Sequence, residues 1–480
     1  MRLALTGPSP TTGLAGPVAI GAGLLLLGLA PLIRGGNRHV ALILLEWLSL
    51  ILLLVLAARA MVLAPRRPVA AGRSERFSGV GVGALALAPL WIGLIQLTPV
   101  PNQLWAELPG RASYAEVLAV AEVPDVGYRV LSLVPDQTVV SLLAGLPLSA
   151  AFLLAFLCSA RQLVLLVKAL VVFAVAQAIL GLLQMGPFPG LSFGAAIGGR
   201  AIGTFANPNH FASYIAMTVP LAILALRQST VTPRERAPAK GGRQHLSILW
   251  GVGLFLLLSA VLASGSRGGT VTCLVVTLLA VLWFPMRQGH RRDHRRWRLA
   301  GAVALLALVA LAVGVDALMS RFESDKSGYL AGDRWQMVIG AWHAAVAFWP
   351  FGSGLGSFAA VFPTFHPAGV RGFVEHAHND YVELLMEGGL LAVALWALAL
   401  TLSIRQIAAL VRRAHRHGLD PASQLQASCG LGLLAVLLHS WVDFNLRIPA
   451  NAMLAAFLLG AFLRPPSVET PAKPAQPMPN

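Results

Sequence analysis

Residues 40–64, VALILLEWLSLILLLVLAARAMVLA, form an almost unbroken apolar run. An α-helix needs about 20 such residues to cross the hydrocarbon core of a bilayer. Comparable runs recur along the chain, which is 56% hydrophobic and only 12% charged over 480 residues. Its mean hydropathy of +0.72 lies well outside the range of ordinary soluble globular proteins. The sequence therefore predicts an all-α integral membrane protein.

Apolar runs of this length predict about twelve transmembrane helices. They lie near residues 17–33, 40–64, 79–99, 137–157, 162–185, 209–226, 247–263, 270–286, 299–317, 380–404, 424–441 and 449–463. The sequence shows no convincing internal repeat and no separate soluble domain, so residues 1–463 predict one polytopic membrane domain. A cap is expected at about 318–379, between the ninth and tenth helices. The proline-rich residues 464–480 predict a disordered cytoplasmic tail.

The formal charge of +16 is concentrated in short loops between the predicted spans. Lys and Arg mark the cytoplasmic side of membrane proteins. With the N-terminus in the cytoplasm, the arginine-rich loops near 65–76, 227–245, 287–298 and 405–417 all fall on that side, and only the loop with Arg34 and Arg38 disagrees. The N-terminus lacks the features of a cleaved secretory signal, so the first run is expected to be retained. Every unusual polar motif then lies on the opposite, external face.

The motif GGRAIGTFANPNHFASY predicts a helix start on the external face. Asn207 is a good N-cap and Pro208 suits the first helical position. Helix N-termini attract anions, and Arg200 would add a guanidinium that can bind phosphate. An ordinary capped helix with an interfacial arginine explains the same residues. A channel signature of the NPA kind is a weaker alternative, because the chain has only one such NPN.

A second arginine, Arg267, lies in the turn LASGSRGG on the same face. An arginine at membrane depth usually has a functional partner, although it can also reach lipid headgroups. The flanking glycines expose backbone N–H groups and leave room for a ligand. Arg334 begins a predicted amphipathic helix that ends near Phe348, and it is either a third anion ligand or a surface residue. The following GSGLGSF resembles a nucleotide loop only superficially, because no strand precedes it and no lysine follows.

The stretch VEHAHNDYVELLMEGGL, residues 374–390, places acid–base groups directly before an apolar run. Asp380 and Glu383 have the spacing of a capping box at the start of the tenth helix. Glu387 comes about 10 Å into that helix and needs a partner. A histidine at the positive end of a helix, such as His376 or His378, tends to stay neutral and suits a general base. A metal site formed by both histidines and an acid is the rival interpretation, although no zinc-type spacing supports it.

The motif HSWVDFNLRIPANA joins the last two predicted spans on the external face. An ion pair between Asp443 and Arg447 that closes this turn is the simplest interpretation, and a direct catalytic role is the alternative. Arginines at two external turns, a helix N-terminus and a histidine base would together bind a pyrophosphate and deprotonate an incoming hydroxyl. A small-anion transporter, for example of bicarbonate, is the alternative of another class. It would place charged groups near the bilayer midplane and broken helices in repeated halves.

Four motifs together resemble the O-antigen ligase and Wzy-type polymerase superfamily of bacterial inner-membrane glycan ligases. They are R-x-x-GTF-x-NPN at Arg200 to Asn209, S-x-SRGG at Ser264 to Gly269, R…W…P-x-G-x-G-x-G-x-F at Arg334 to Phe358, and HAHN with E-x-G at His376 to Gly389. The resemblance covers roughly residues 195–460. The ligase branch has a further glycine where this chain has Ala392, and HSWVDFNLRIPANA looks more like exopolysaccharide-associated members.

The resemblance implies a fold of the GT-C type in the inner membrane, with cytoplasmic termini and a periplasmic active site. It further implies metal-independent, inverting transfer of a glycan from undecaprenyl pyrophosphate, without a cofactor or nucleic acid. The acceptor would be lipid A core, a growing glycan or a protein. Carried over, His378 is the catalytic base. The substrate-binding residues are Arg200, Arg267, Arg334, Asn207 and Asn209, and the supporting residues are His376, Glu387 and Asp443.

Overall fold

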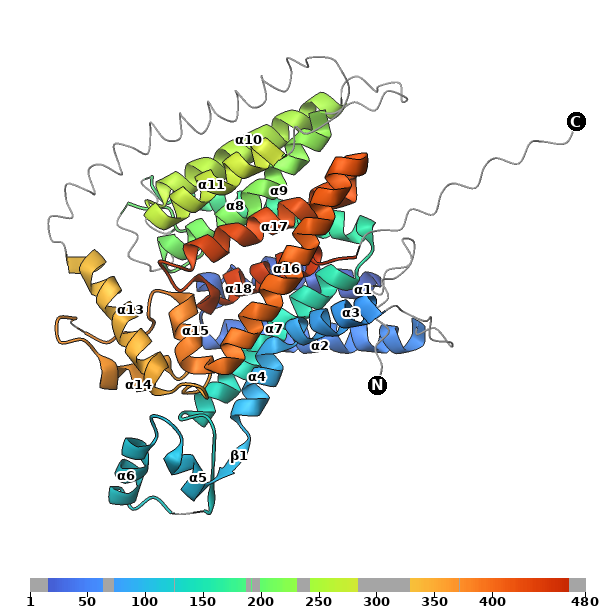
Figure 1. Cartoon of the computed structure of the whole chain (residues 1–480). Helices are drawn as coiled ribbons and strands as arrows, with labels where there is room; N and C mark the ends of the chain where they lie inside the picture. The colour runs from blue at the N-terminus through green and yellow to red at the C-terminus, as the bar shows by residue number, and fades with distance from the viewer. Residues whose placement is uncertain are drawn as a thin grey trace, which may run out of the picture.

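A computed structural model describes residues 16–63, 73–124, 126–186, 191, 199–230, 242–283, 329–370 and 372–465. This part of the chain is a bundle of helices with one small two-stranded sheet (Figure 1). The predicted ninth span at 299–317, the loop 287–298 and residues 466–480 of the predicted tail lie outside the described residues. The cap between the ninth and tenth helices is described from residue 329 onward.

Seven described helices are long and apolar enough to cross a membrane, or eight if one bent pair forms a single span. The seven are α2 (His39–Leu63), α7 (Pro135–Leu157), α8 (Ala160–Leu183), α9 (Pro208–Thr230), α10 (Gly242–Ala263), α16 (Leu390–His417) and α17 (Pro421–His439). Three shorter apolar helices occupy other predicted spans: α1 (Pro17–Leu29), α11 (Arg267–Trp283) and α18 (Pro449–Phe462). The chain is therefore a multi-pass, mainly α-helical membrane protein.

The bent pair consists of α3 (Arg73–Ala86) and α4 (Ala88–Gln96), whose axes differ by 66°. Pro89 lies in the first turn of α4. A proline lacks the N–H that would continue a helix, and its ring excludes the carbonyl of the preceding turn. The predicted span at 79–99 is therefore bent at Leu87.

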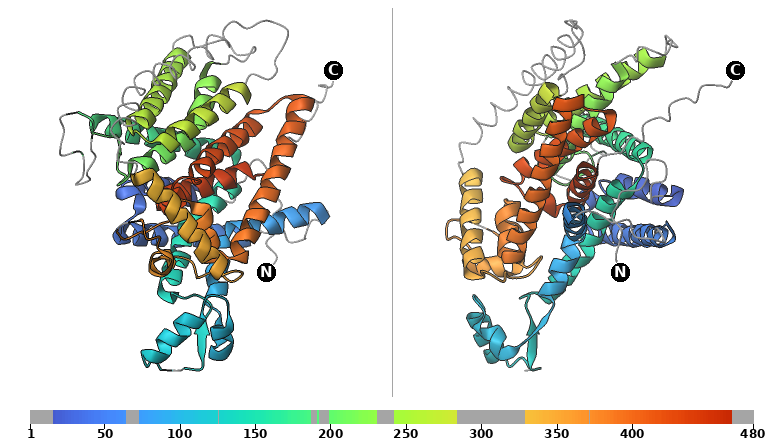
Figure 2. Two further views of the ribbon diagram at one scale, coloured as in Figure 1. Left: turned by 60° about the vertical axis from the view of Figure 1, so that its left-hand side comes forward. Right: turned by 45° about the vertical axis from the view of Figure 1, so that its right-hand side comes forward.

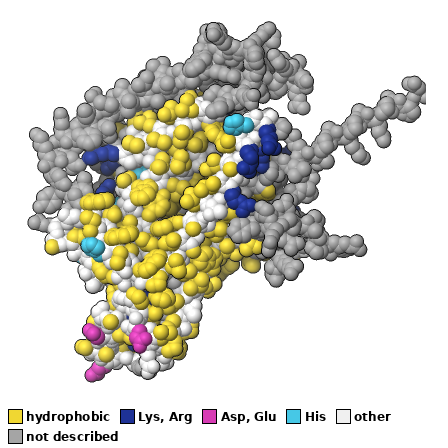
Figure 3. Space-filling view, in the orientation of Figure 1, with side chains coloured by type: hydrophobic (Ala, Val, Ile, Leu, Met, Phe, Trp, Pro, Cys, Tyr) yellow, Lys and Arg dark blue, Asp and Glu magenta, His cyan; other side chains and the backbone are white. Residues whose placement is uncertain are grey.

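Two helices form the centre of the bundle. Helix α9 is buried along most of its length, and α10, α11 and α17 pack around it. Helix α18 is buried along most of its length against α7 and α17, and it lies near the middle of the molecule in both views of Figure 2. On the face shown in Figure 3, apolar side chains cover a large part of the described surface of the helices, as lipid contact requires. The site described below lies where α9 and α18 begin.

Outside the spans, a small projection follows α4. Its strands β1 (Pro99–Pro101) and β2 (Tyr128–Val130) pair antiparallel and enclose α5 (Asn102–Glu107) and α6 (Ala112–Val120). The fully buried Arg111 ties this projection to the cap, because its Nη2 donates to Leu131 O at 2.6 Å and to Gly352 O at 3.0 Å. Burial lowers the pKa of Arg111 to about 10. Sequence reasoning did not single out this residue.

The cap contains α13 (Tyr329–Ala347), α14 (Phe358–Val361) and α15 (Asp380–Gly388). The predicted amphipathic helix that starts at Arg334 is confirmed within α13, which begins five residues earlier. Its inner face, with Ala341 and Ala344, packs on α15 and on the 3₁₀ turn Phe362–Phe365, while Trp335 and Trp342 are exposed. Short 3₁₀ turns occur at η1 (Arg34–Gly36), η3 (Phe362–Phe365) and η4 (Asn445–Arg447).

The expected continuous tenth span is wrong, because the chain breaks between α15 and α16. Gly389 stands at the break with φ 53° and ψ −130°, a conformation open essentially to glycine alone. The loop GSGLGSF docks here, since Leu390 N donates to Pro350 O at 2.7 Å and Gly354 N donates to Glu387 O at 3.0 Å. This glycine-rich loop is therefore a packing element that fixes α15.

Replacing Gly389 with alanine is expected to destabilise the protein by about 1–3 kcal/mol or more, because its Cβ would also collide with Pro350 O. The control is Gly251→Ala in α10, where the nearest atom to the new Cβ is 4.0 Å away. Thermal unfolding in detergent measures both variants. Equal midpoints for the two variants would contradict the role of the break.

Candidate active site

His378 lies immediately before α15 in a strained backbone conformation. Its φ is 53°, which is uncommon for a residue other than glycine. The next residue, Asn379, caps α15, because its Oδ1 accepts from Tyr381 N at 3.0 Å and from Val382 N at 3.1 Å. Its Nδ2 donates to Trp441 O at 3.0 Å, which ties the cap to the α17–α18 junction. These contacts hold His378 in place, and strain of this kind is concentrated at functional sites.

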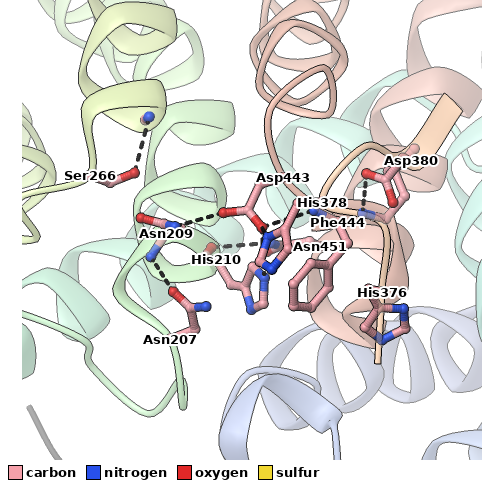
Figure 4. A network of polar contacts seen from close by, with 12 residues as sticks. Asn207, Asn209, His210, Ser266, His376, His378, Asp380, Asp443, Phe444 and Asn451 are labelled. Carbon is pink, nitrogen blue, oxygen red and sulfur yellow. Dashed lines mark hydrogen bonds and ion pairs between the residues drawn. The ribbon is translucent and has the colours of Figure 1, made fainter. Parts of the chain in front are cut away.

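Asp443 orients the His378 ring. His378 Nδ1 lies 3.1 Å from Asp443 Oδ1, and Asn209 Nδ2 donates to Asp443 Oδ2 at 2.6 Å (Figure 4). The Asp443 side chain is 1% exposed, whereas that of His378 is 22% exposed. When Nδ1 carries the proton and donates to Asp443, Nε2 is left with a lone pair on the more accessible residue. A histidine held in this way can act as a general base.

The carboxylate of Asp443 is stabilised in its charged form. Burial alone would raise the pKa of Asp443, but the hydrogen bond with His378 and the charges of neighbouring groups, including Arg334, bring it below its usual value. Phe444 N donates to Asp443 Oδ1 at 3.0 Å, and His210 Nε2 lies 3.9 Å from the same oxygen. Asp443 is therefore ionised at neutral pH and can stabilise a protonated His378.

Three histidines surround Phe444. Its ring stacks on His376 at 4.4 Å between centroids, and it meets His378 at 4.9 Å and His210 at 4.7 Å edge to face. His210 is anchored through its backbone, because Asn451 Nδ2 donates to its carbonyl at 3.0 Å. No sequence motif predicted a role for His210, Phe444 or Asn451. The signals in the sequence were the position of His210 directly after NPN and of Phe444 within VDFN.

A second charged cluster forms around Arg447. Arg447 Nε lies 3.0 Å from Glu383 Oε1, and Arg447 Nη2 donates to Glu387 Oε2 at 2.5 Å. Glu383 also binds His376 Nδ1 at 2.8 Å and accepts from Ala377 N at 2.8 Å. Arg447 is therefore the partner that the buried carboxylate of Glu387 requires. His376, predicted to be a supporting residue, is held by this cluster.

Two local predictions are wrong. Asp380 and Glu383 do not form a capping box, because Asn379 is the N-cap and Asp380 Oδ2 accepts from Leu446 N at 2.9 Å. Asp443 and Arg447 do not pair with each other. The η4 turn packs against α15, so Asp380 accepts from the backbone of η4 and Arg447 pairs with Glu383 and Glu387. Asp443 instead pairs with His378.

The two predicted arginine loops are neighbours. Arg200 Nε donates to Ser264 O at 2.7 Å, and Ala201 N donates to Ala263 O at 3.1 Å. Arg267 begins α11 and is exposed, as is Arg334 in α13. The predicted cap of α9 is confirmed, because Asn207 Oδ1 accepts from Asn209 N at 2.8 Å. The structure thus joins Asn209 to the His378–Asp443 pair and places the Arg200 loop against the turn that precedes Arg267.

The rival metal site is not formed by the described residues, among which no group of three or more His, Cys, Asp and Glu side chains could hold a metal ion. His376 and His378 each bind a different carboxylate, Glu383 and Asp443. The arrangement therefore offers two separate histidine–carboxylate pairs. A histidine paired with a carboxylate in this way is suited to proton transfer.

Residues 252–397 match the family model described as O-antigen ligase. This match supports the resemblance of the chain to the O-antigen ligase and Wzy-type polymerase superfamily. The matched segment includes Arg267, Arg334 and His378. No curated protein and no solved structure matches the chain. The match supports a membrane enzyme of the glycan ligase or polymerase kind.

Replacing Arg447 with methionine is expected to destabilise the protein by about 3–5 kcal/mol, because Glu383 and Glu387 would remain buried without their cation. The matched control is Arg412→Met on the exposed surface of α16. Unfolding midpoints in detergent compare the two variants. A midpoint for Arg447→Met as high as that of the control would refute the buried ion-pair network.

Proposed function

We propose that this protein transfers a glycan from undecaprenyl pyrophosphate to an acceptor hydroxyl, in the manner of an O-antigen ligase. The observation that supports this most directly is the His378–Asp443 pair at 3.1 Å, in a chain whose Arg200 and Arg267 turns lie side by side. The proposal places the protein in the bacterial inner membrane, with about twelve GT-C-type spans and both termini in the cytoplasm. The site would then face the periplasm.

In the proposed mechanism, His378 is the general base. Its Nε2 takes the proton from the acceptor hydroxyl as that oxygen attacks the anomeric carbon of the donor. The bond between this carbon and the pyrophosphate oxygen breaks, and attack from the opposite face inverts the configuration. Asp443, ionised and bound to Nδ1, stabilises the imidazolium that forms. Asn209 fixes the other oxygen of Asp443 and so maintains its orientation.

The leaving group in this mechanism is a lipid pyrophosphate. Arg200 and Arg267 would bind its oxygens, with Arg334 as a helper, and would stabilise the negative charge that grows as the bond breaks. Asn207 caps α9, whose N-terminus adds a favourable partial charge. These groups would let the reaction proceed without a metal ion or another cofactor. His376 and Glu387 would support the site through the Arg447 cluster.

Changing His378 to alanine is expected to lower transfer by about 10²–10⁴-fold, because the general base is lost. Binding of the lipid-linked donor should change less than about threefold, since the arginines remain. The control is His343→Ala, an exposed histidine on α13. Transfer is measured in membranes with lipid-linked donor, and donor binding is measured separately. Full activity of His378→Ala would overturn the mechanism.

Changing Arg267 to alanine is expected to weaken donor binding by about 10–100-fold, the usual range for a hydrogen bond to a charged group. Arg267→Lys should retain part of the affinity, because lysine keeps the charge but loses the two-pronged geometry. Arg412→Ala, an exposed arginine near the C-terminal end of α16, is the control. An unchanged donor KM in Arg267→Ala would remove this residue from the pyrophosphate site.

The acceptor separates three versions of the proposal. A ligase would use a sugar of lipid A core, an exopolysaccharide polymerase would use another repeat unit, and a protein O-oligosaccharyltransferase would use a Ser or Thr hydroxyl. Surface glycans from a deletion strain distinguish them on a gel. Lipopolysaccharide without long chains supports the first, shortened free polymer the second, and unmodified glycoprotein the third.

The alternative of another class is a transporter of a small anion such as bicarbonate. The bent pair α3–α4 is the feature that favours it, because broken helices are typical of transporters. Proteoliposomes that take up labelled anion and transfer no glycan would establish this alternative. Transfer without uptake would reject it.

A further inference from the structure

His439 is a buried residue that the mechanism above does not use. It is the last residue of α17, its relative exposure is 1%, and its Nδ1 has no hydrogen-bond partner in the described part of the chain. Its electrostatic surroundings include Asp443 and Arg334. The residue is too deeply buried to meet a substrate directly, so any role must act through its neighbours.

The His439 ring lies against the arginine turn. A Cβ built on Gly268 would lie 2.7 Å from both Cδ2 and Nε2 of His439, closer than any side chain could tolerate. Gly268 directly follows Arg267 in α11. The absence of a side chain at Gly268 therefore lets the ring press directly on the backbone beside Arg267.

This contact joins the two halves of the site. Helix α17 ends at His439 and leads within four residues to Asp443, the partner of His378. Helix α11 begins at Arg267, on the side where the donor would bind. Helices α11 and α17 also pack against each other, so the His439 ring at the end of α17 affects how close the two helices lie beside Arg267.

We propose that His439 is a positioning residue that sets the spacing between the Arg267 turn and the His378–Asp443 pair. This inference rests on the proposed function. Reacting atoms must lie about 3–3.5 Å apart in the correct orientation, and a displacement near 1 Å can lower the rate by about 10²-fold. Loss of the spacer therefore affects kcat, whereas loss of Arg267 affects donor binding.

The test is a double-mutant cycle of His439→Ala and Gly268→Ala. Each single change is expected to lower kcat by about 10–100-fold with the donor KM within about threefold. In the double mutant, the space left by the ring accommodates the new methyl group. The loss of kcat is then smaller than the product of the two single losses. His439→Gln, which fills similar volume, should retain more kcat than His439→Ala.

Gly251→Ala is the control for a glycine replacement in a helix without a close neighbour. Thermal midpoints of the same variants test the contact apart from activity, because His439→Ala should relieve the clash in Gly268→Ala. If the unmodified protein is active, the inference is overturned when the kcat loss of the double mutant equals the product of the two single losses, or when only donor KM changes. If the unmodified protein transfers no glycan, the proposed function is refuted. In that case, a fall in thermal midpoint for the double mutant that equals the sum of the two single falls would refute the contact as well.

Discussion

Asp443 is an ionised carboxylate in a nearly closed environment, and the surrounding elements are arranged so that its charge is compensated. A buried charge without partners is costly, so its two oxygens must be occupied. Asn209 from the start of α9, His378 from the start of α15 and the backbone of Phe444 occupy them. Three segments that are far apart in the sequence therefore meet at one side chain, and His378 acquires its orientation from that meeting.

Buried charge is compensated in the same way around Arg447. Arg447 neutralises Glu383 and Glu387, and Glu383 in turn holds His376. These ion pairs fix the short η4 turn, between α17 and α18, to α15. Gly389 and the docked GSGLGSF loop allow α15 to stand apart from α16. The irregular backbone is sheltered within protein, which membranes require.

The family match and the geometry of the site support different parts of the proposed function. The match to the O-antigen ligase family model supports a membrane enzyme that ligates or polymerises glycans. The geometry supplies an oriented histidine, an ionised partner and two adjacent arginine turns, which suit deprotonation of a hydroxyl beside a bound pyrophosphate. His439, at the end of α17 and against α11, is proposed to link the donor-binding turn to the His378–Asp443 pair.

The sequence by itself determined the membrane class, most helix positions and the resemblance to the O-antigen ligase superfamily, because apolar length and the order of short motifs are local properties. It also identified His378, Arg200 and Arg267 as residues to examine. The sequence did not predict which side chains pair. The structure has contacts between residues 60 or more positions apart in place of the expected Asp443–Arg447 pair and Asp380–Glu383 capping box. Only the tertiary structure decided which acid meets which base, because that choice depends on how η4 packs on α15 and on where a buried charge can be compensated.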